Sequence, residues 1–461
     1  MKKIILILLT LIMAFSFAAC SALDEETAIA LKSDTYSIYE QLKKDLAKAA
    51  SNEEICDYLS DFAEKHNLTA NNQADGTIVL IKQPSEEHIA AKTTTLQCGI
   101  SPETIKEDAP AMAIALAVLK NTKDSGKITA IFTGEEGSEY TGATALNEKY
   151  LETDNFINLT HSPNTRLFTG SAATAKYSIS TPITKVDATA KKAYRVSITG
   201  LHGQDYSDYI RSHPNPIKTL SSLLASCRSS GITLQLAEFS GGTDPASGQK
   251  GATFTVLIND TDEAKFLRKV SNSKEDFDDD YSEDEPDLSY HYEETTPPTT
   301  VLPDATTETF LGLMYTLEEG VFATSEKDNE GDILAISTLT SLVLDDSAIT
   351  LTVSGRSIDD KIMEEMNQTF SEIARLSDYD FQTLSTSPLW QPRKENPLAD
   401  SFTMAAKQAD LELTPDTTFM RTECSIFIGK NPSLNLISLG VNIQDALELS
   451  KSLVLFLNSQ G

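Results

Sequence analysis

The spacing of apolar residues divides the first third of the chain into alternating helices and strands. Residues 51–68 place apolar side chains three and four positions apart, and the segment opens on Ser51 and Glu54, which have the spacing of a helix-capping box. Strands are predicted over 76–83 and 127–133, and a buried helix over 111–120. Alternation of this kind favours an α/β layer around a largely parallel sheet.

The pattern changes after about residue 174. Further strands are predicted over 192–203, 251–258, 331–344 and 348–357, and helices over 215–231, 306–319 and 359–377. These two groups of strands and helices suggest an α+β domain with two similar halves. The α/β style returns from about residue 388, with a strand at 435–440 and a last helix at 445–458.

An acidic segment at 275–294 separates the two groups. It carries eleven carboxylates in twenty positions without a lysine or arginine, and prolines follow it. Self-repulsion between the carboxylates predicts a disordered, solvated loop, which we bound at 273–300. A calcium site is the alternative, although the glycine and the closing glutamate of an EF-hand loop are missing.

The overall charge limits the partners that the chain can have. A formal charge of −30 should repel phosphate backbones and anionic lipid head groups. We therefore expect no nucleic-acid binding and no electrostatic adsorption to membranes. The cysteines Cys56, Cys98, Cys227 and Cys424 are scattered without a CxxC spacing, which argues against a zinc knuckle or redox motif and predicts buried free thiols.

The first twenty residues form a secretion signal. Two lysines precede an apolar run, and small residues lead to Cys20. The end of this segment resembles a bacterial lipoprotein box, which implies that residues 1–19 are removed and that Cys20 is lipidated. The alternative is an ordinary signal peptide with a chance cysteine. The lipoprotein interpretation predicts a protein outside the cytoplasm that acyl groups hold at the cell membrane.

An ordered set of short segments carries a family resemblance over most of the remaining chain. The segments are "TGEEGSEYTGA", "FINLTHSPNTRLFTGSAA", "GLHGQDYSDY", "VSGRS" and "TECSIF". Together they resemble the Xaa-His dipeptidases (aminoacyl-histidine dipeptidases), a branch of the dinuclear-zinc metallopeptidases. The resemblance implies a zinc-peptidase-like three-layer α/β domain from residues 20–174 and 386–461. An α+β lid or dimerisation domain would be inserted at 175–385.

The resemblance also assigns candidate active-site residues. Glu135 stands at the position of the general base, and Glu136 at a zinc-ligand position. Glu107 or Asp108 could supply the bridging carboxylate, although such a pair can also be a solvated helix start. His161 follows Thr160, where the family has an aspartate. It could replace that ligand or be a structural histidine.

Other family positions are changed. Gly99 and Ser101 stand where the family has a metal-binding histidine and the aspartate that orients it, and no histidine follows the strand at 435–440. The lid histidine that would polarise the substrate carbonyl falls at Asp205 or Tyr206. Arg356 matches a substrate-facing position of the lid, and a surface salt bridge is its alternative.

These changes lead to three functional hypotheses. The first is a catalytically inactive, dipeptidase-like lipoprotein that binds a peptide, another small ligand or a protein, with no cofactor expected. The second is an active exported metallo-dipeptidase that holds zinc at a rearranged site. The third is a structural protein that forms a homodimer through the inserted domain.

Overall fold

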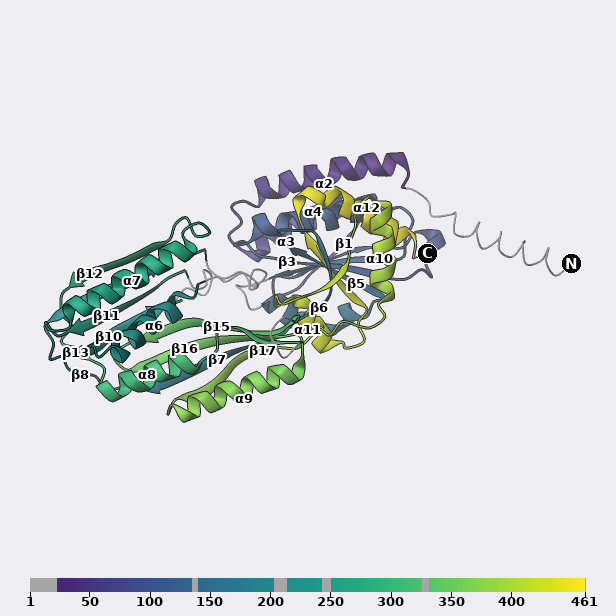
Figure 1. Cartoon of the computed structure of the whole chain (residues 1–461). Coiled ribbons are helices and arrows are strands. Elements are labelled where there is room, and N and C mark those ends of the chain that lie inside the picture. Colours follow the sequence, from purple (N-terminus) through teal and green to yellow (C-terminus); the bar gives the residue numbers. More distant parts are fainter. Residues whose placement is uncertain (1–22, 135–139, 203–213, 243–249, 326–330, 461) are drawn as a thin grey trace. The chain divides into compact units, whose positions relative to one another are not determined.

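The computed structural model describes residues 23–134, 140–202, 214–242, 250–325 and 331–460 (Figure 1). The chain forms two compact units. Unit 1 comprises Met1–Ser171, Trp390–Thr417 and Thr422–Gly461, and unit 2 comprises Ala172–Leu389 and Thr418–Arg421. Each unit has its own sheet and its own hydrophobic core.

The sheet of unit 1 has the strand order β1-β2-β4-β3-β5-β19-β6-β18. The strands are β1 (Thr69–Asn72), β2 (Ile78–Lys82), β3 (Thr94–Ile100), β4 (Ile128–Gly134), β5 (Asn155–His161), β6 (Arg166–Ser171), β18 (Pro415–Thr418) and β19 (Leu436–Val441). The four central strands β3, β4, β5 and β19 pair in parallel, and β2 and β6 pair antiparallel beside them. The carboxyl ends of the central strands therefore meet at one edge of the sheet.

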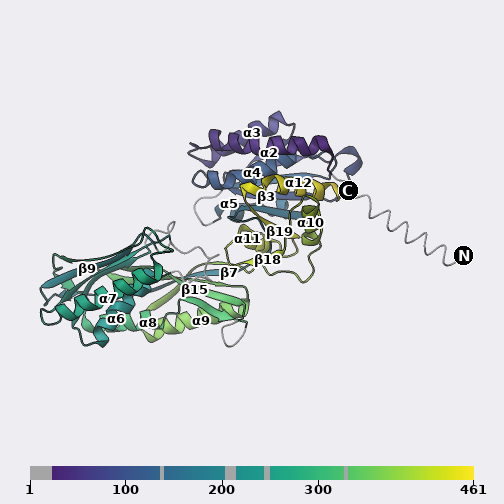
Figure 2. The same cartoon turned by 45° about the horizontal axis from the view of Figure 1, so that its top comes forward.

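Helices cover both faces of this sheet (Figures 1 and 2). One face packs against α2 (Glu25–Asp45), α3 (Asn52–Lys65), α4 (Ile105–Asn121), α10 (Pro397–Gln408) and α12 (Ala446–Asn458). The other packs against α5 (Thr141–Ala145) and α11 (Glu423–Lys430). The predicted cap is present, because the Ser51 side chain accepts from the backbone N–H of Glu54 at 3.4 Å. Helix α4 is buried along most of its length, as its continuous apolar run predicts.

The sheet of unit 2 has the order β12-β9-β11-β10-β15-β16-β7-β17, and β14 pairs with β15. The strands are β7 (Ala173–Pro182), β9 (Lys192–Thr199), β10 (Leu234–Gly241), β11 (Ala252–Ile258), β12 (Ser289–Thr295), β14 (Gly320–Thr324), β15 (Ile333–Leu344), β16 (Ala348–Ser357) and β17 (Asp380–Ser387). A separate ladder joins β8 (Val186–Asp187) to β13 (Thr300–Val301). The core lies between the large sheet and α6 (Pro216–Ser229), α7 (Glu263–Tyr281), α8 (Asp304–Thr316) and α9 (Asp360–Leu376).

This sheet consists of two halves with the same topology. The first half runs β9-α6-β10-β11-α7-β12, and the second runs β7-α8-β15-β16-α9-β17. In each half the first strand lies between the third strand and the last, and the halves meet where β10 pairs with β15. The expectation of two similar halves therefore agrees with the strand order.

The acidic segment is ordered, so the prediction of a disordered loop over 273–300 was wrong. Helix α7 and strand β12 run through it. Phe266, Val270 and Phe277 are buried on one face of α7, at a spacing that brings them onto the core of unit 2. The ring of Tyr290 on β12 packs edge-on against Phe277 at 5.8 Å. Most of the carboxylates on α7 are exposed, where water and salt screen their repulsion. Glu285, after α7, is buried and accepts from the backbone N–H of His202 at 2.8 Å.

The four described cysteines are all free and buried, as predicted. Burial raises the pKa of the Cys56 and Cys227 thiols to about 11. Thiolate chemistry at these two sites is therefore suppressed near neutral pH. No helix in the described part of the chain is long and apolar enough to span a membrane.

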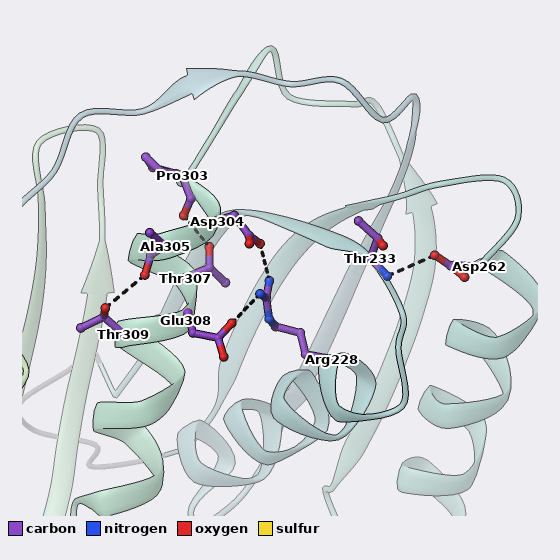
Figure 3. A network of polar contacts seen from close by, with 9 residues as sticks. All are labelled: Arg228, Thr233, Asp262, Pro303, Asp304, Ala305, Thr307, Glu308 and Thr309. Carbon is purple, nitrogen blue, oxygen red and sulfur yellow. Dashed lines mark hydrogen bonds and ion pairs between the residues drawn. The ribbon is translucent and has the colours of Figure 1, made fainter.

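Arg228 joins α6 to α8 within unit 2. Figure 3 shows its guanidinium between two carboxylates that lie one turn apart near the start of α8, with Nη1 at 2.7 Å from Asp304 Oδ1 and Nη2 at 2.6 Å from Glu308 Oε2. The hydrogen bond and charge of Arg228 lower the pKa of Asp304. A carboxyl group whose pKa is lowered in the folded protein stabilises the fold at pH values above its ordinary pKa. This stabilisation is lost as the pH falls through the lowered pKa.

Replacing Arg228 by alanine should lower the melting temperature of unit 2 near neutral pH, and the difference from wild type should shrink as the pH falls below 3.8, the ordinary pKa of Asp304. Both carboxylates are exposed, so we expect a loss of at most about 1 kcal/mol. Calorimetry over a pH series measures it. Arg268→Ala, at an exposed position of α7, removes the same charge and serves as control. A pH-independent difference for Arg228→Ala would contradict the assignment.

Candidate functional site

The carboxyl edge of the parallel strands in unit 1 is the place where the resemblance puts a metal centre. Gly99 on β3 lies opposite Thr133 on β4, and Thr160 on β5 lies opposite Gly440 on β19. Ser101 is buried just after β3, and its Oγ accepts from the backbone N–H of Glu103 at 3.2 Å. These positions offer hydrogen atoms and hydroxyl groups where imidazole and carboxylate would be needed.

A buried polar network lies on the same face of the sheet. Gln97 and Asn158 come two residues before Gly99 and Thr160, so strand alternation places them on one face with those positions. Asn158 Nδ2 donates to Gln97 Oε1 at 2.6 Å, and Ser438 Oγ on β19 donates to Asn158 Oδ1 at 2.5 Å. Polar side chains thus connect the central strands just behind their carboxyl ends.

Glu423, the first residue of α11, is the centre of this network. Its Oε1 accepts from Gln97 Nε2 and from Thr133 Oγ1, both at 2.7 Å, and its Oε2 accepts from Asn158 Nδ2 at 3.2 Å. The side chain is only 6% exposed. The amino end of a helix and several donors compensate for the burial of a carboxylate. These contacts are those of a structural acceptor that holds β3, β4 and β5 together.

The other end of α11 is also fixed. Lys430 Nζ donates to the carbonyl groups of Ala143, Thr144 and Leu146 at 3.1, 2.5 and 2.7 Å, where α5 ends. Burial lowers the pKa of this lysine. Helix α11 therefore binds the ends of the strands through Glu423, and it binds the end of α5 through Lys430. Helix α5 follows the segment that contains Glu135 and Glu136.

Several predicted site residues lie outside the described residues, namely Glu135, Glu136, Asp205 and Cys20. Glu107 and Asp108 occupy the first turn of α4, where Glu107 is exposed and Asp108 Oδ2 accepts from Thr104 Oγ1 at 2.7 Å. This geometry is that of a helix start, which was the alternative interpretation of the pair.

His161 does not join the face that carries Thr160. It is the last residue of β5 and lies opposite Val441, whose side chain belongs to the core on the α4 side of the sheet. Alternation along β5 sends His161 to that side, and the side chain is exposed. The expectation that His161 could replace a ligand at Thr160 therefore fails on strand geometry.

Arg356 lies on β16 of unit 2 and is half-buried. Its Nη1 donates to the backbone carbonyl of Phe419 at 2.8 Å. Nearby, Arg421 Nε donates to Ser387 Oγ at 2.7 Å. Both arginines thus connect residues 418–421 to strands of unit 2, a role that neither interpretation of Arg356 included.

No protein-family model matches the sequence, and no curated protein matches it significantly. Among solved structures, the aminoacylhistidine dipeptidase from Vibrio alginolyticus has a TM-score of 0.70 and 18% identity, covering 93% of this chain and 96% of that one. A tripeptidase from Staphylococcus aureus gives 0.53 and 11%, with 93% and 98% covered. Human carnosine dipeptidase 1 gives 0.50 and 9%, with 95% and 99% covered.

This chain has the fold of those dipeptidases. The predicted architecture, a three-layer α/β domain with an inserted α+β domain, is confirmed. At such low identity the likeness concerns the fold alone.

The described residues do not fit the dinuclear zinc centre that the resemblance implies. Two zinc ions need about five histidine and carboxylate ligands. No group of three His, Cys, Asp or Glu side chains among the described residues is arranged to hold a metal ion. The donor chemistry explains this result, since Gly99, Ser101 and Thr160 offer no imidazole or carboxylate and Glu423 is bound by amides and a hydroxyl.

Unit 2 contains a groove of about 650 Å³ between α6 and α7. Hydroxyl groups of Thr219, Ser222 and Ser226 line its α6 side. On the α7 side, Lys269 donates to Ser226 Oγ at 3.0 Å, and Asp276 follows about 10 Å further along the helix. Lys218, Asp280 and Glu319 also line the groove, so it carries charges of both signs.

Proposed function

We propose that this protein is an exported lipoprotein, anchored through Cys20, that uses a dipeptidase-like fold to bind small peptides without hydrolysing them. The N-terminal signal supports the export and the anchor. The dipeptidase-like fold supports a small peptide as the ligand. The acidic surface supports a partner other than nucleic acid or an anionic lipid.

The Glu423 network is the observation that carries the proposed loss of catalysis. A metal-bound water needs ligands that converge at the strand ends and a carboxylate free to take its proton. At this edge the described positions hold glycine and hydroxyl groups, and the buried carboxylate behind them accepts from Gln97, Thr133 and Asn158. Stability of the strand ends thus comes from side-chain hydrogen bonds.

A metal and turnover assay tests the proposal. The soluble chain without Cys20, incubated with zinc or manganese and desalted, should retain much less than one metal ion per chain. It should also give no hydrolysis of a panel of Xaa-His dipeptides. Stoichiometric metal, together with turnover that Glu135→Gln abolishes, would instead establish the active dipeptidase, which the paired Glu135 and Glu136 favour.

Calorimetric titration with the same dipeptides tests the binding. We expect saturable binding that weakens several-fold in Lys269→Ala and in Asp276→Asn, because each substitution removes one charge of the groove in unit 2. Lys265→Ala, on an exposed position of the same helix, is the matched control. Binding that none of these substitutions changes would place the ligand elsewhere, and no binding by any dipeptide would refute the proposed ligand class.

A further inference from the structure

Very little chain separates the proposed lipid anchor from the folded domain. Leu23 is the first described residue, and the Asp24 carboxylate caps α2 by accepting from the Thr27 N–H at 2.8 Å and from its hydroxyl at 2.7 Å. Three residue steps from Cys20 to Leu23 span at most about 11 Å. If Cys20 is lipidated, as the proposed function requires, the start of α2 must stay within that distance of the acylated residue.

The start of α2 lies at the amino edge of the sheet in unit 1, opposite the candidate site. Glu26 pairs with Lys123, just beyond the end of α4, at 3.5 Å. At the other end of the chain, the Gln460 carbonyl accepts from the Lys92 N–H at 3.4 Å, immediately before β3. Figures 1 and 2 both show the beginning of α2 close to the C-terminal end of the chain. We infer that this amino-edge surface is the face of unit 1 that rests on the lipid bilayer.

A hollow of about 390 Å³ opens on this surface. It is lined at the start of α2 by Leu23 and Ala28, at the end of α10 by Gln408 and the next two residues, Ala409 and Asp410, and on α12 by Lys451 and Leu455. Most of these side chains are apolar, and the Lys451 stem can lie along them while its ammonium group reaches a phosphate. The hollow therefore suits the boundary between head groups and acyl chains.

The exposed apolar side chains of unit 1 gather toward the same edge. Ile89, three residues before Lys92, is 73% exposed, Ile29 on α2 is 64% exposed, and Met404, one turn before the end of α10, is 63% exposed. They are the three most exposed large apolar side chains in the described part of unit 1. Isolated apolar side chains on a surface are ordinary, and these three contribute to membrane contact only if the inferred orientation brings this edge to the bilayer.

Electrostatics explains why this surface depends on the anchor. Asp24, Glu25, Glu26 and Asp410 lie on or beside it, and the net charge of the chain opposes adsorption to anionic lipids. A covalent acyl anchor overcomes this barrier by keeping the surface at a high local concentration next to the bilayer. The weak apolar contacts then orient the domain, with the carboxyl edge and its candidate site pointing away from the membrane.

Bromolipid quenching of a site-specific probe tests the inference. The full lipidated chain carrying Gln408→Cys, labelled with a polarity-sensitive fluorophore, is reconstituted in vesicles of zwitterionic phosphatidylcholine. The described native cysteines are buried, so the label goes to the new thiol. Asn164→Cys, exposed in the loop after β5 at the carboxyl edge, is the matched control. We expect the Gln408→Cys probe to lose most of its emission and the Asn164→Cys probe to lose almost none.

The outcomes separate this inference from the proposed anchor. Equal quenching at both probes, or stronger quenching at Asn164→Cys, in a chain that mass spectrometry shows to be acylated would overturn the orientation alone. A chain that carries no acyl group and does not bind vesicles would overturn the anchor and the orientation together. Adding Ile29→Ser, Ile89→Ser and Met404→Ser should reduce the quenching at Gln408→Cys while acylation is unchanged, and undiminished quenching would refute the role of these side chains.

Discussion

Replacing Glu423 by alanine should lower the free energy of unfolding of unit 1 by about 3–5 kcal/mol. The substitution removes the acceptor that Gln97, Thr133 and Asn158 share in the interior of the protein. Asn158 Nδ2 keeps Gln97 Oε1 and Gln97 Nε2 keeps Thr133 Oγ1, but the hydrogen bonds to the carboxylate are lost. Each hydrogen bond to a buried carboxylate that is lost costs about 1–3 kcal/mol. Chemical denaturation followed by circular dichroism measures the loss, and calorimetry assigns it to one of the two units.

Two further variants separate the network from a general effect of the substitution. Glu423→Gln keeps the volume but turns an amide donor toward other donors, so it should lose about 1–3 kcal/mol. Asp400→Asn removes an exposed carboxylate from the first turn of α10, and it should stay within about 0.5 kcal/mol of wild type. If Glu423→Ala were as stable as Asp400→Asn, Glu423 could not be what holds the strand ends.

Local sequence signals gave most of the elements of the fold. The capping pair Ser51 and Glu54 and the apolar run of α4 act through neighbours in the sequence, so they can be interpreted without the fold. The order of family-like segments supplied the architecture that connects the elements. The prediction for the acidic segment was wrong because it rested on the charge composition and left out the helical spacing of the apolar residues. Phe266, Val270 and Phe277 carried the helical signal throughout.

The polar network around Glu423 could not be predicted from the sequence. Gln97, Asn158 and Ser438 each stand three residues before the last residue of their strand, and this shared offset is a signal that could have been found. Their partner Glu423 lies hundreds of residues away from Gln97 and Asn158 in the chain. Only the sheet order brings these residues together, so the geometry that carries the proposed loss of catalysis came from tertiary structure.

The ordered acidic segment leads to the second large prediction. Phe277→Ala should destabilise unit 2 by about 3–5 kcal/mol, because it empties a buried site where the phenylalanine ring contacts Tyr281 and Tyr290. The loss should also be local, since α7 and β12 share this contact. Hydrogen exchange followed by mass spectrometry should show slow exchange over 275–294 in the wild type and much faster exchange in the variant.

The matched control is Asp279→Ala, two residues along the same helix on its exposed face. Alanine has the higher helix propensity and removes one of the repelling carboxylates, so this variant should be as stable as wild type or slightly more stable. If charge governed the segment, Asp279→Ala would have the larger effect and Phe277→Ala little. If instead the helical spacing of apolar residues governs the structure of the segment, as the buried face of α7 indicates, Phe277→Ala has the larger effect. Rapid exchange over 275–294 in the wild type would refute the ordered helix itself.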